Sequence, residues 1–454
     1  MVPEVMKVLC FDISSGGLGR AVFDENLKAS DAAEIRWDIH QDSDGAAVLP
    51  LETLRAALRA SMNSVASVAI DAISFSGFMH SSVLLDASDR ALTPVFTWMD
   101  RRGNHAVEML KREFGPQFHQ RTGCRFHPMF PVFKAATFRP PALRRVVSAK
   151  SVLIAELTGN WIEDHGSASA SGFYNTGAGE WDPDLLRAID LDPSVLPPLV
   201  ERGDVAGKTA AGIPVVAGSG DGFLANLGSG CDVPQRIAIT LGTSSSVRQV
   251  LAHPVFDDAA GTFCYRAQAN SFLLGCASNN GGNVMDWGRS LFTKLPETAS
   301  RAKALPTFIP LLNGERSPEW DPFLTGGWHG LQSHHTAEDL AHSIVDGVVF
   351  NLAHYAGILE SASGEHAIQA VLSGNGFLSA AARETIAAVL DAEVLRPPDQ
   401  GLASLRGAAV CGFQALGVDV AAGLQRLVDT AERIPRADAP QIRERYARYR
   451  AIRK

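Results

Sequence analysis

The sequence lacks the long apolar segments, the basic excess and the leader pattern that mark membrane, nucleic-acid-binding and secreted proteins. No run approaches the roughly 18 uninterrupted apolar residues of a transmembrane helix, so no membrane partner is expected. The segment MVPEVMKVLCFD has no basic stretch followed by a cleavage site, which predicts a cytoplasmic protein. The formal net charge is −8 and no domain is basic, so no nucleic-acid partner is expected.

Cysteine is scarce as well. The chain has six cysteines, scattered through its length and without any C-x-x-C pair. Disulfide frameworks and zinc sites place their cysteines at short, regular spacings. We therefore expect reduced, buried thiols and no zinc site.

Glycine, by contrast, is abundant. The chain has 41 glycines in 454 residues, above the usual share of roughly 7%. Hydrophobic residues make up 46% and charged residues 20%, which is ordinary for a globular protein. At about 150 residues per domain, the length favours two domains. We place them at residues 1–212 and 213–454, with a hinge near Ala206–Val215.

The chain alternates short β-rich runs with helical stretches, which predicts an α/β fold. The run Val5–Phe11 ends in Asp12, passes through a small-residue turn and returns as Arg20–Phe23. In the middle of the chain, Arg236–Thr240 likewise enters a small-residue turn and returns as Val247–Leu251. We interpret the halves as two copies of one α/β unit that face a cleft.

The two turns have the composition of anion-binding loops. Asp12 precedes ISSGGLG, whose backbone amides could approach phosphate oxygens because glycine has no Cβ. A carboxylate at such a strand tip can hold Mg²⁺ through water. The second turn, residues 242–246, offers amides and hydroxyls but no Walker A lysine. Each turn alone could be an ordinary hairpin, but the pair favours a nucleoside triphosphate bound from both halves.

Two further glycine-rich junctions follow strands. In VVAGSGDGFLANLGSG (215–230), Asp221 stands where a helix could begin and could accept a proton from a substrate hydroxyl. A plain N-cap aspartate is the alternative interpretation. Gly374 and Asn375 follow the run ending at Ser373, and this turn could admit a base or a ribose.

Polar loops of the first half suggest an acceptor substrate. Residues 78–81, 98–102 and 127–129 carry tryptophan, histidine, aspartate and arginine on successive loops. Such loops suit a polyol with an anionic end, since arginine binds carboxylates through two parallel hydrogen bonds. Arg102 is the predicted carboxylate-binding cation. Each of these residues could equally be an ordinary core or surface residue.

These segments together resemble the FGGY family of carbohydrate kinases over residues 7–430. The resemblance is carried by GDGFLANLGSG (220–230), ITLGTSSSVR (239–248), GERSPEWDP (314–322) and GGWHGL (326–331). ISFSGFMHS (73–81) and TGCRFHPMFP (122–131) are typical of the gluconokinase branch. The resemblance implies an α/β fold of two ribonuclease-H/actin-like domains around a cleft, with ATP and Mg²⁺ as cofactors.

The resemblance also implies roles for individual residues. It makes Asp221 the catalytic base and Asp12 the residue that helps to hold Mg²⁺. The residues implied to meet the ATP phosphates are Ser14, Ser15, Gly242, Thr243 and Ser244, and those bordering the adenosine are Gly374 and Asn375. The residues implied to bind the sugar are Met79, His80, Met129 and Asp221, together with Asp100 and Arg102 of the W-x-D-x-R run.

The chain departs from the family pattern at three places. Its first turn reads Ser14-Ser15-Gly16-Gly17, and Gly19 stands where the family has lysine or arginine. Thr137 stands where the first family signature usually has tryptophan. The stretch between Arg289 and Pro310 is short for the family. These changes affect the expected contacts with the ATP phosphates and the expected identity of the substrate. They do not affect the assignment of Asp221 as the catalytic base.

The expected activity is ATP-dependent phosphorylation of a primary hydroxyl of a sugar or aldonic acid, with gluconate giving 6-phosphogluconate. A kinase for xylulose, or for another polyol or aldonate, is the alternative within the family. A catalytically impaired regulator that binds sugar and ATP, and an actin-like filament protein, are alternatives of other classes. The expected partner is a small sugar or sugar-acid substrate, and a homodimer is left open.

Overall fold

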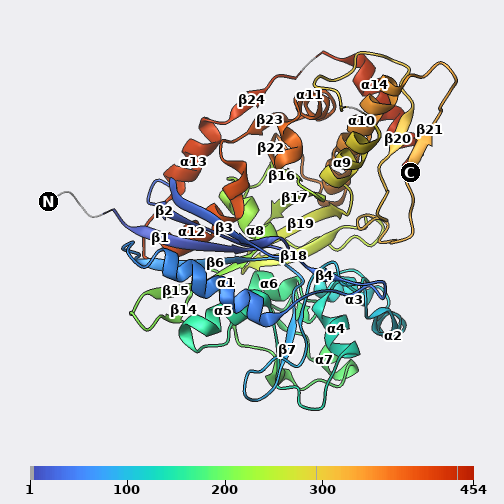
Figure 1. Ribbon diagram of the computed structural model, residues 1–454. Coiled ribbons are helices and arrows are strands. Elements are labelled where there is room, and N and C mark those ends of the chain that lie inside the picture. Colours follow the sequence, from blue (N-terminus) through green and yellow to red (C-terminus); the bar gives the residue numbers. More distant parts are fainter. Residues whose placement is uncertain (1–4, 293, 437, 454) are drawn as a thin grey trace.

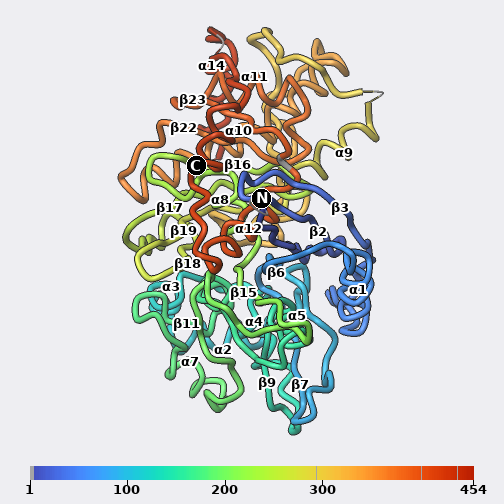
Figure 2. Tube along the Cα trace, turned by 90° about the vertical axis from the view of Figure 1, so that its left-hand side faces the viewer, coloured from blue at the N-terminus to red at the C-terminus, as the bar shows by residue number. Residues whose placement is uncertain are grey.

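The computed structural model describes residues 5–292, 294–436 and 438–453. The first half of the chain occupies the lower part and most of the second half the upper part of Figures 1 and 2. A mixed sheet of order β14-β15-β6-β1-β2-β3 organises the first half. Its strands are β1 (Lys7–Ile13), β2 (Gly17–Asp24), β3 (Ala29–Arg36), β6 (Ala72–Gly77), β14 (Val205–Lys208) and β15 (Pro214–Gly220).

A second mixed sheet, of order β18-β19-β17-β16-β22-β23-β24, organises the second half. Its strands are β16 (Arg236–Leu241), β17 (Ser245–Leu251), β18 (Phe263–Gln268), β19 (Ser271–Ser278), β22 (Gln369–Ser373), β23 (Glu393–Arg396) and β24 (Glu432–Ile434). The strands β18 and β19 form a hairpin around Ala269 and Asn270.

The two sheets share one arrangement. In the first, β1 runs antiparallel to β2 and parallel to β6, which in turn runs parallel to β15. In the second, β16 runs antiparallel to β17 and parallel to β22, which runs parallel to β23. The prediction of two copies of one α/β unit is therefore confirmed.

Alternating residues of β1 build two separate cores on the two faces of the first sheet. Leu9 and Phe11 pack under helices α1 (Leu51–Ser64) and α5 (Ala149–Thr158). Val8 and Cys10 pack on the other face, under α8 (Asp221–Gly228) and α12 (Ala403–Ala415). A strand buried on both faces reads as one continuous apolar run, as this strand does.

The position of α12 complicates the division into domains. This helix lies near the C-terminal end of the sequence, yet it packs beside β1 and β6 of the first half (Figure 1). The strand β15 and helix α8, which follow residue 212, also belong to the first sheet and its layers. Strand pairing thus favours a division between α8 and β16. The boundaries 1–212 and 213–454 stay a prediction.

Helices cover both faces of the second sheet as well. One face packs against α9 (Gly282–Leu291), α10 (Ala337–Ser363) and α11 (Ala380–Val389), and the other against α13 (Ala421–Asp429). Thr336 and Asp339 form a capping box at the start of α10. The C-terminal helix α14 (Pro440–Ile452) docks through the buried Ile442 and Tyr449.

A smaller lobe between β6 and β14 carries the polar loops. Its helices are α2 (Asn104–Phe114), α3 (Gln117–Thr122), α4 (Pro131–Thr137), α6 (His165–Ser169) and α7 (Pro183–Ala188). Its short strands are β7 (Val83–Leu85), β8 (Val95–Phe96), β9 (Arg145–Val147), β10 (Glu163–Asp164), β11 (Tyr174–Asn175), β12 (Glu180–Trp181) and β13 (Leu199–Val200), and β8 pairs with β5 (Ala47–Leu49) and through it with β4 (His40–Gln41). Phe130 and Phe133 of this lobe share a core with Phe263 and Tyr265 of β18, which joins the lobe to the second half.

The remaining elements are short. They are the strands β20 (Thr307–Ile309) and β21 (Gly327–His329) and the single turns η1 (Pro193–Val195), η2 (Asn375–Leu378) and η3 (Gln400–Leu402). The strand β6 begins only at Ala72, because the chain makes turns after α1. All six cysteines are buried and unpaired. No helix in the described ranges has the length and apolarity to cross a membrane.

Candidate active site

A cleft of about 290 Å³ lies where the ends of β1, β6 and β15 meet the β16–β17 turn. Most of the site residues named from the sequence line it together. These residues are Ser14, Ser15, Met79, His80, Met129, Asp221, Thr243 and Ser244. They are contributed by segments of both halves of the chain, so the cleft forms only in the folded molecule.

Asp221 is the first residue of α8, and Gly220 takes the N-cap position. Its Oδ1 accepts hydrogen bonds from the backbone N–H of Gly222 (2.8 Å) and Met79 (3.3 Å). Among the described residues, none donates to Oδ2. Burial raises the pKa of this carboxyl, while the nearby Arg248 partly offsets the effect. The carboxylate is thus fixed through one oxygen, and the other is available as a proton acceptor.

Asp12 lies beside Asp221 at the end of β1. Its Oδ1 accepts a hydrogen bond from the Ser76 hydroxyl at 2.5 Å. Burial raises the pKa of Asp12 to about 6, and the neighbouring Asp221 adds to this rise. Two close carboxylates of like charge favour a cation between or beside them. One or two carboxylates, with water and substrate phosphates, are the usual protein share of an Mg²⁺ site, so these residues fit that ion.

The first turn is closed mainly by its own atoms. The hydroxyl of Ser14 accepts hydrogen bonds from the backbone N–H of Gly16 and Gly17, both at 3.1 Å. Gly17 begins β2, and a Cβ there would lie 2.6 Å from the carbonyl oxygen of Ile35. Ser15 lines the cleft, and no described residue pairs with its hydroxyl. Ser15 is therefore the donor of this turn that a ligand can reach.

The second turn is more open to a ligand. Gly242 N–H donates to the carbonyl oxygen of Ser244, which tightens the turn. The hydroxyls of Thr243 and Ser244 have no partner in the described part of the chain and line the cleft. Gly282, at the start of α9, donates its N–H to the Gly242 carbonyl oxygen at 2.7 Å. The N-terminus of α9 thus lies against this turn and favours negative charge there.

Gly374 and Asn375 lie next to the second turn but outside the lining of the cleft. Gly374 has φ +91°, and a Cβ on it would lie 2.4 Å from the carbonyl oxygen of Leu241. Only glycine permits this approach of η2 to the end of β16. Asn375 is exposed at the start of η2.

His80 has a fixed tautomer. Its Nδ1 lies 2.7 Å from the carbonyl oxygen of Ala170, so this nitrogen carries the proton and Nε2 is left as an acceptor. Burial lowers the pKa of His80 to about 3, and the cation of Arg316 adds to this. A neutral imidazole that accepts hydrogen bonds suits a sugar hydroxyl.

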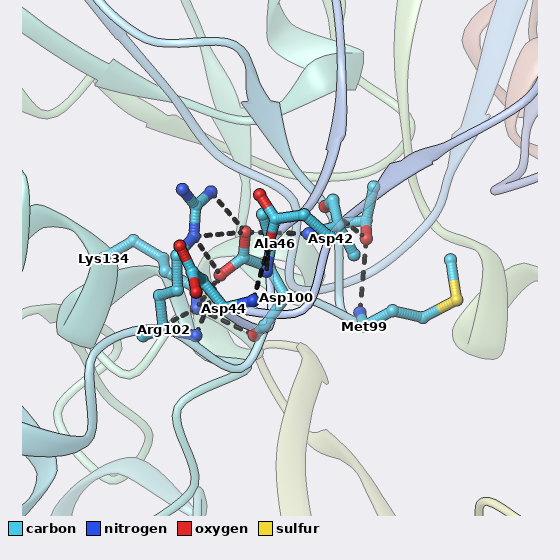
Figure 3. Close-up of polar contacts among 9 residues, drawn as sticks. Asp42, Asp44, Ala46, Met99, Asp100, Arg102 and Lys134 are labelled. Atoms are coloured by element: carbon cyan, nitrogen blue, oxygen red, sulfur yellow. Dashed lines mark hydrogen bonds and ion pairs between the residues drawn. The ribbon is translucent and has the colours of Figure 1, made fainter.

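The structure does not bring Asp100 and Arg102 to the cleft. Asp100 is fully buried, and its carboxylate binds Lys134 Nζ at 2.8 Å and Arg102 Nη2 at 2.6 Å. Figure 3 shows both cations drawn to Asp100, with the Met99 side chain pointing away. The Arg102 guanidinium also stacks on Phe138, 5.0 Å from the ring centroid. The predicted carboxylate-binding role of Arg102 therefore finds no support, because its charge is already paired.

Comparison with known proteins identifies the family. Residues 8–228 match the N-terminal domain, and residues 237–416 the C-terminal domain, of the FGGY family of carbohydrate kinases. The chain belongs to this family. It is 30% identical over 386 residues to a gluconokinase of Bacillus subtilis (strain 168), covering 77% of this chain and 75% of that protein. It is 31% identical over 374 residues to a xylulose kinase of Streptomyces coelicolor, covering 78% of this chain and 76% of that protein.

Solved structures agree with this assignment. A gluconate kinase from Lactobacillus acidophilus superposes with a TM-score of 0.91 at 24% identity, over 99% of this chain and 98% of that one. A kinase from Brucella ovis described as a xylulose kinase gives a TM-score of 0.90 at 25% identity, over 98% of each chain. The predicted two-domain actin-like fold of this FGGY kinase is confirmed.

Two arginines that line the cleft were not named among the site residues from the sequence. Arg248 donates to Asn226 Oδ1 at 2.9 Å and to Thr240 Oγ1 at 3.0 Å. Arg316 lies over the ring of Trp98 at 5.1 Å. Both stand inside segments that carry the FGGY resemblance, ITLGTSSSVR and GERSPEWDP. The place of each arginine inside such a motif was the sequence signal that could have marked it as a site residue. The direction in which its side chain points depends on tertiary packing, which the motif does not show.

Gly374→Ala is expected to destabilise this FGGY kinase and to raise its KM for ATP. The new Cβ would meet the Leu241 carbonyl oxygen and displace the second turn. The matched control is Gly364→Ala, which also has positive φ (+71°) but no atom within 4 Å of the new Cβ. The control should lose about 1 kcal/mol from backbone strain alone and keep its KM for ATP. Steady-state kinetics and urea unfolding of both variants measure the difference, and equal KM values would contradict the prediction.

His127 is expected to make the kinase less stable as the pH falls. Burial lowers the pKa of His127 to about 3, with the cations of Arg316 and Lys134 contributing. The unfolded chain takes up the proton near pH 6.5 and the folded chain does not. Stability is therefore full above pH 6.5 and declines toward pH 3, by roughly 1.4 kcal/mol per pH unit for this residue.

The test compares urea unfolding of the wild type and His127→Asn at pH 7.5, 6.5 and 5.5. In the wild type, the Met129 N–H donates a hydrogen bond to His127 Nδ1 at 3.2 Å. Asparagine retains a side-chain oxygen that can accept this bond. The variant should show the shallower decline below pH 6.5. Parallel curves for the two proteins would show that His127 is not responsible.

Proposed function

We propose that this FGGY carbohydrate kinase transfers the γ-phosphoryl group of ATP to a primary hydroxyl of gluconate, giving 6-phosphogluconate. The observation that carries the proposal is Asp221, whose free carboxylate oxygen faces a cleft shared by the sugar loops and two phosphate-type turns. The gluconokinase of Bacillus subtilis, at 30% identity, supports the choice of acceptor.

In the proposed mechanism the chain positions both substrates and moves one proton. The Nε2 of His80 accepts a hydrogen bond from a sugar hydroxyl, and Met79 and Met129 pack on the carbon chain. Asp221 Oδ2 accepts the proton of the attacking primary hydroxyl, whose oxygen forms a bond to the γ-phosphorus as the bond to the β-phosphate oxygen breaks. Positioning and a fixed base carry most of the catalysis in this reaction class.

The phosphates of ATP are assigned to the two turns. Ser15 donates from the first half, and Thr243 and Ser244 donate from the second. Asp12 would hold Mg²⁺ through water, and this ion would neutralise charge on the β- and γ-phosphates. The adenosine of ATP is assigned to the neighbourhood of Gly374 and Asn375.

A neutral ketose such as xylulose is the second candidate acceptor. The 31% identity to the Streptomyces coelicolor xylulose kinase favours it about as well as the gluconokinase match favours gluconate. A regulator without turnover is disfavoured because Asp221 lines the cleft and Asp12, at the end of β1, lies close enough to interact with it. Cytoplasmic location and a homodimer stay predictions.

A coupled ADP-release screen over aldonates, ketoses and polyols tests the proposal. We expect the highest kcat/KM with gluconate. Without Mg²⁺ we expect no ADP release. A preference for xylulose would replace the acceptor, and binding of ATP without ADP release under any acceptor would favour the regulator.

A further inference from the structure

Arg316 reaches from the second half of the chain into the sugar-binding side of the cleft. It lies in the segment GERSPEWDP, between β20 and β21. Its guanidinium stands over the indole of Trp98, a residue of the first half, at 5.1 Å from the ring centroid. Arg316, Trp98 and His80 all line the cleft. A cation is therefore placed beside the loops that the proposed function assigns to the sugar.

The position of Arg316 is held by a buried carboxylate. Glu315 is fully buried and accepts hydrogen bonds from Ser278 Oγ (2.7 Å), Tyr355 Oη (2.8 Å) and the Arg316 backbone N–H (2.8 Å). Arg316 Nη2 donates to the Ser278 carbonyl oxygen at 2.8 Å. The backbone and one nitrogen of the side chain are thus fixed before any ligand binds, which lowers the entropic cost of recognition.

The rest of the guanidinium is unpartnered. Across the described ranges, no residue accepts a hydrogen bond from Arg316 Nε, which is buried, or from Nη1. A buried donor without a partner is rare in folded proteins and calls for an explanation. A planar, permanently charged donor set is suited to a carboxylate.

The second cation that lines the cleft already makes hydrogen bonds of its own. Besides Arg316, the charged side chains that line it are Asp221 and Arg248. Arg248 donates to Asn226 and Thr240 and lies toward the second turn. His80 is neutral at physiological pH, because burial lowers its pKa to about 3. Among the described residues that line the cleft, Arg316 thus keeps two nitrogens, Nε and Nη1, free to donate to an acidic acceptor.

We propose that Arg316 binds the carboxylate of the acceptor substrate and so makes the enzyme select sugar acids over neutral sugars of the same length. The inference rests on the proposed function, and it replaces Arg102, whose charge is paired with Asp100. Trp98 would pack under the ion pair, which reduces its exposure to water.

The experiment compares gluconate with glucitol, which has the same carbon chain but a hydroxymethyl group in place of the carboxylate. In Arg316→Ala, kcat/KM for gluconate should fall by about 100-fold or more, as expected for loss of one partner of a buried charge pair. The value for glucitol should change by less than about threefold, since no ion pair is lost. Arg316→Lys should recover part of the loss, because it keeps the charge but not the planar donors.

Arg145→Ala is the matched control. Arg145 also stacks on an indole, that of Trp161, at 5.3 Å and pairs with Asp89, but it lies outside the cleft. Its removal should leave the ratio of gluconate to glucitol unchanged.

The outcomes separate this inference from the proposed function. If the wild type phosphorylates gluconate and Arg316→Ala loses both acceptors equally, Arg316 serves the phosphates or the fold and the inference is overturned alone. If the wild type uses neutral sugars and rejects gluconate, both fail. A folded Arg316→Lys variant, checked by its melting curve, decides the question if the alanine variant does not fold.

Discussion

Asp221→Asn is expected to lower kcat by about 10²–10⁴-fold, the usual contribution of a positioned general base. The asparagine oxygen can still accept the backbone hydrogen bonds of Met79 and Gly222 that Asp221 Oδ1 accepts now. What is lost is the second carboxylate oxygen and its ability to take a proton. The melting temperature should stay within a few degrees, because burial already disfavours the charge of this carboxyl.

The measurement is single-turnover and steady-state ADP release with the preferred acceptor. Asp192→Asn provides the control, because Asp192 also accepts a backbone N–H, that of Ser194 (2.8 Å), at the start of a helical turn, but lies outside the cleft. It should keep wild-type turnover. A near-normal kcat in Asp221→Asn would remove the residue from the role of base.

The elements and residues that could be predicted are those whose signal is local. The two phosphate-type turns follow from strand, small-residue turn and returning strand, a pattern contained in about fifteen residues of each half. The Thr336–Asp339 capping box and the start of α8 at Asp221 are likewise local, and the structure has both. Local patterns were therefore sufficient to name Ser15, Asp221 and Thr243 as site residues, and all three line one cleft.

The features that could not be predicted depend on contacts between distant segments. Nothing in the sequence around Arg102 shows that it shares the buried Asp100 carboxylate with Lys134, and nothing around Arg316 shows that Trp98 lies under it. The return of α12 to the first sheet is a similar case. It requires the close approach of Gly407 to the carbonyl oxygen of Leu224, 2.1 Å from an added Cβ. Periodicity within one segment carries no information on such partners.

Asp100→Ala is expected to destabilise the protein by about 3–5 kcal/mol, the usual cost of removing one partner of a buried ion pair. Asp100 and Lys134 are both fully buried, and Arg102 shares the carboxylate. Burial alone would raise the pKa of Asp100, but the hydrogen bonds and charges of Arg102 and Lys134 hold it below its usual value. Without the carboxylate, a buried ammonium loses its counter-charge, as the surroundings drawn in Figure 3 make plain.

The prediction separates a structural role from a substrate-binding one. Urea unfolding should show the loss of stability, while the folded Asp100→Ala protein should keep its KM for the acceptor within about threefold, because no direct contact is removed. Asp286→Ala is the control: its pair with Arg289 lies on the surface of α9, where such pairs are worth about 0–1 kcal/mol. A variant of Asp100 with normal stability and a greatly raised KM would instead return the W-x-D-x-R run to the sugar site, and Arg102 with it.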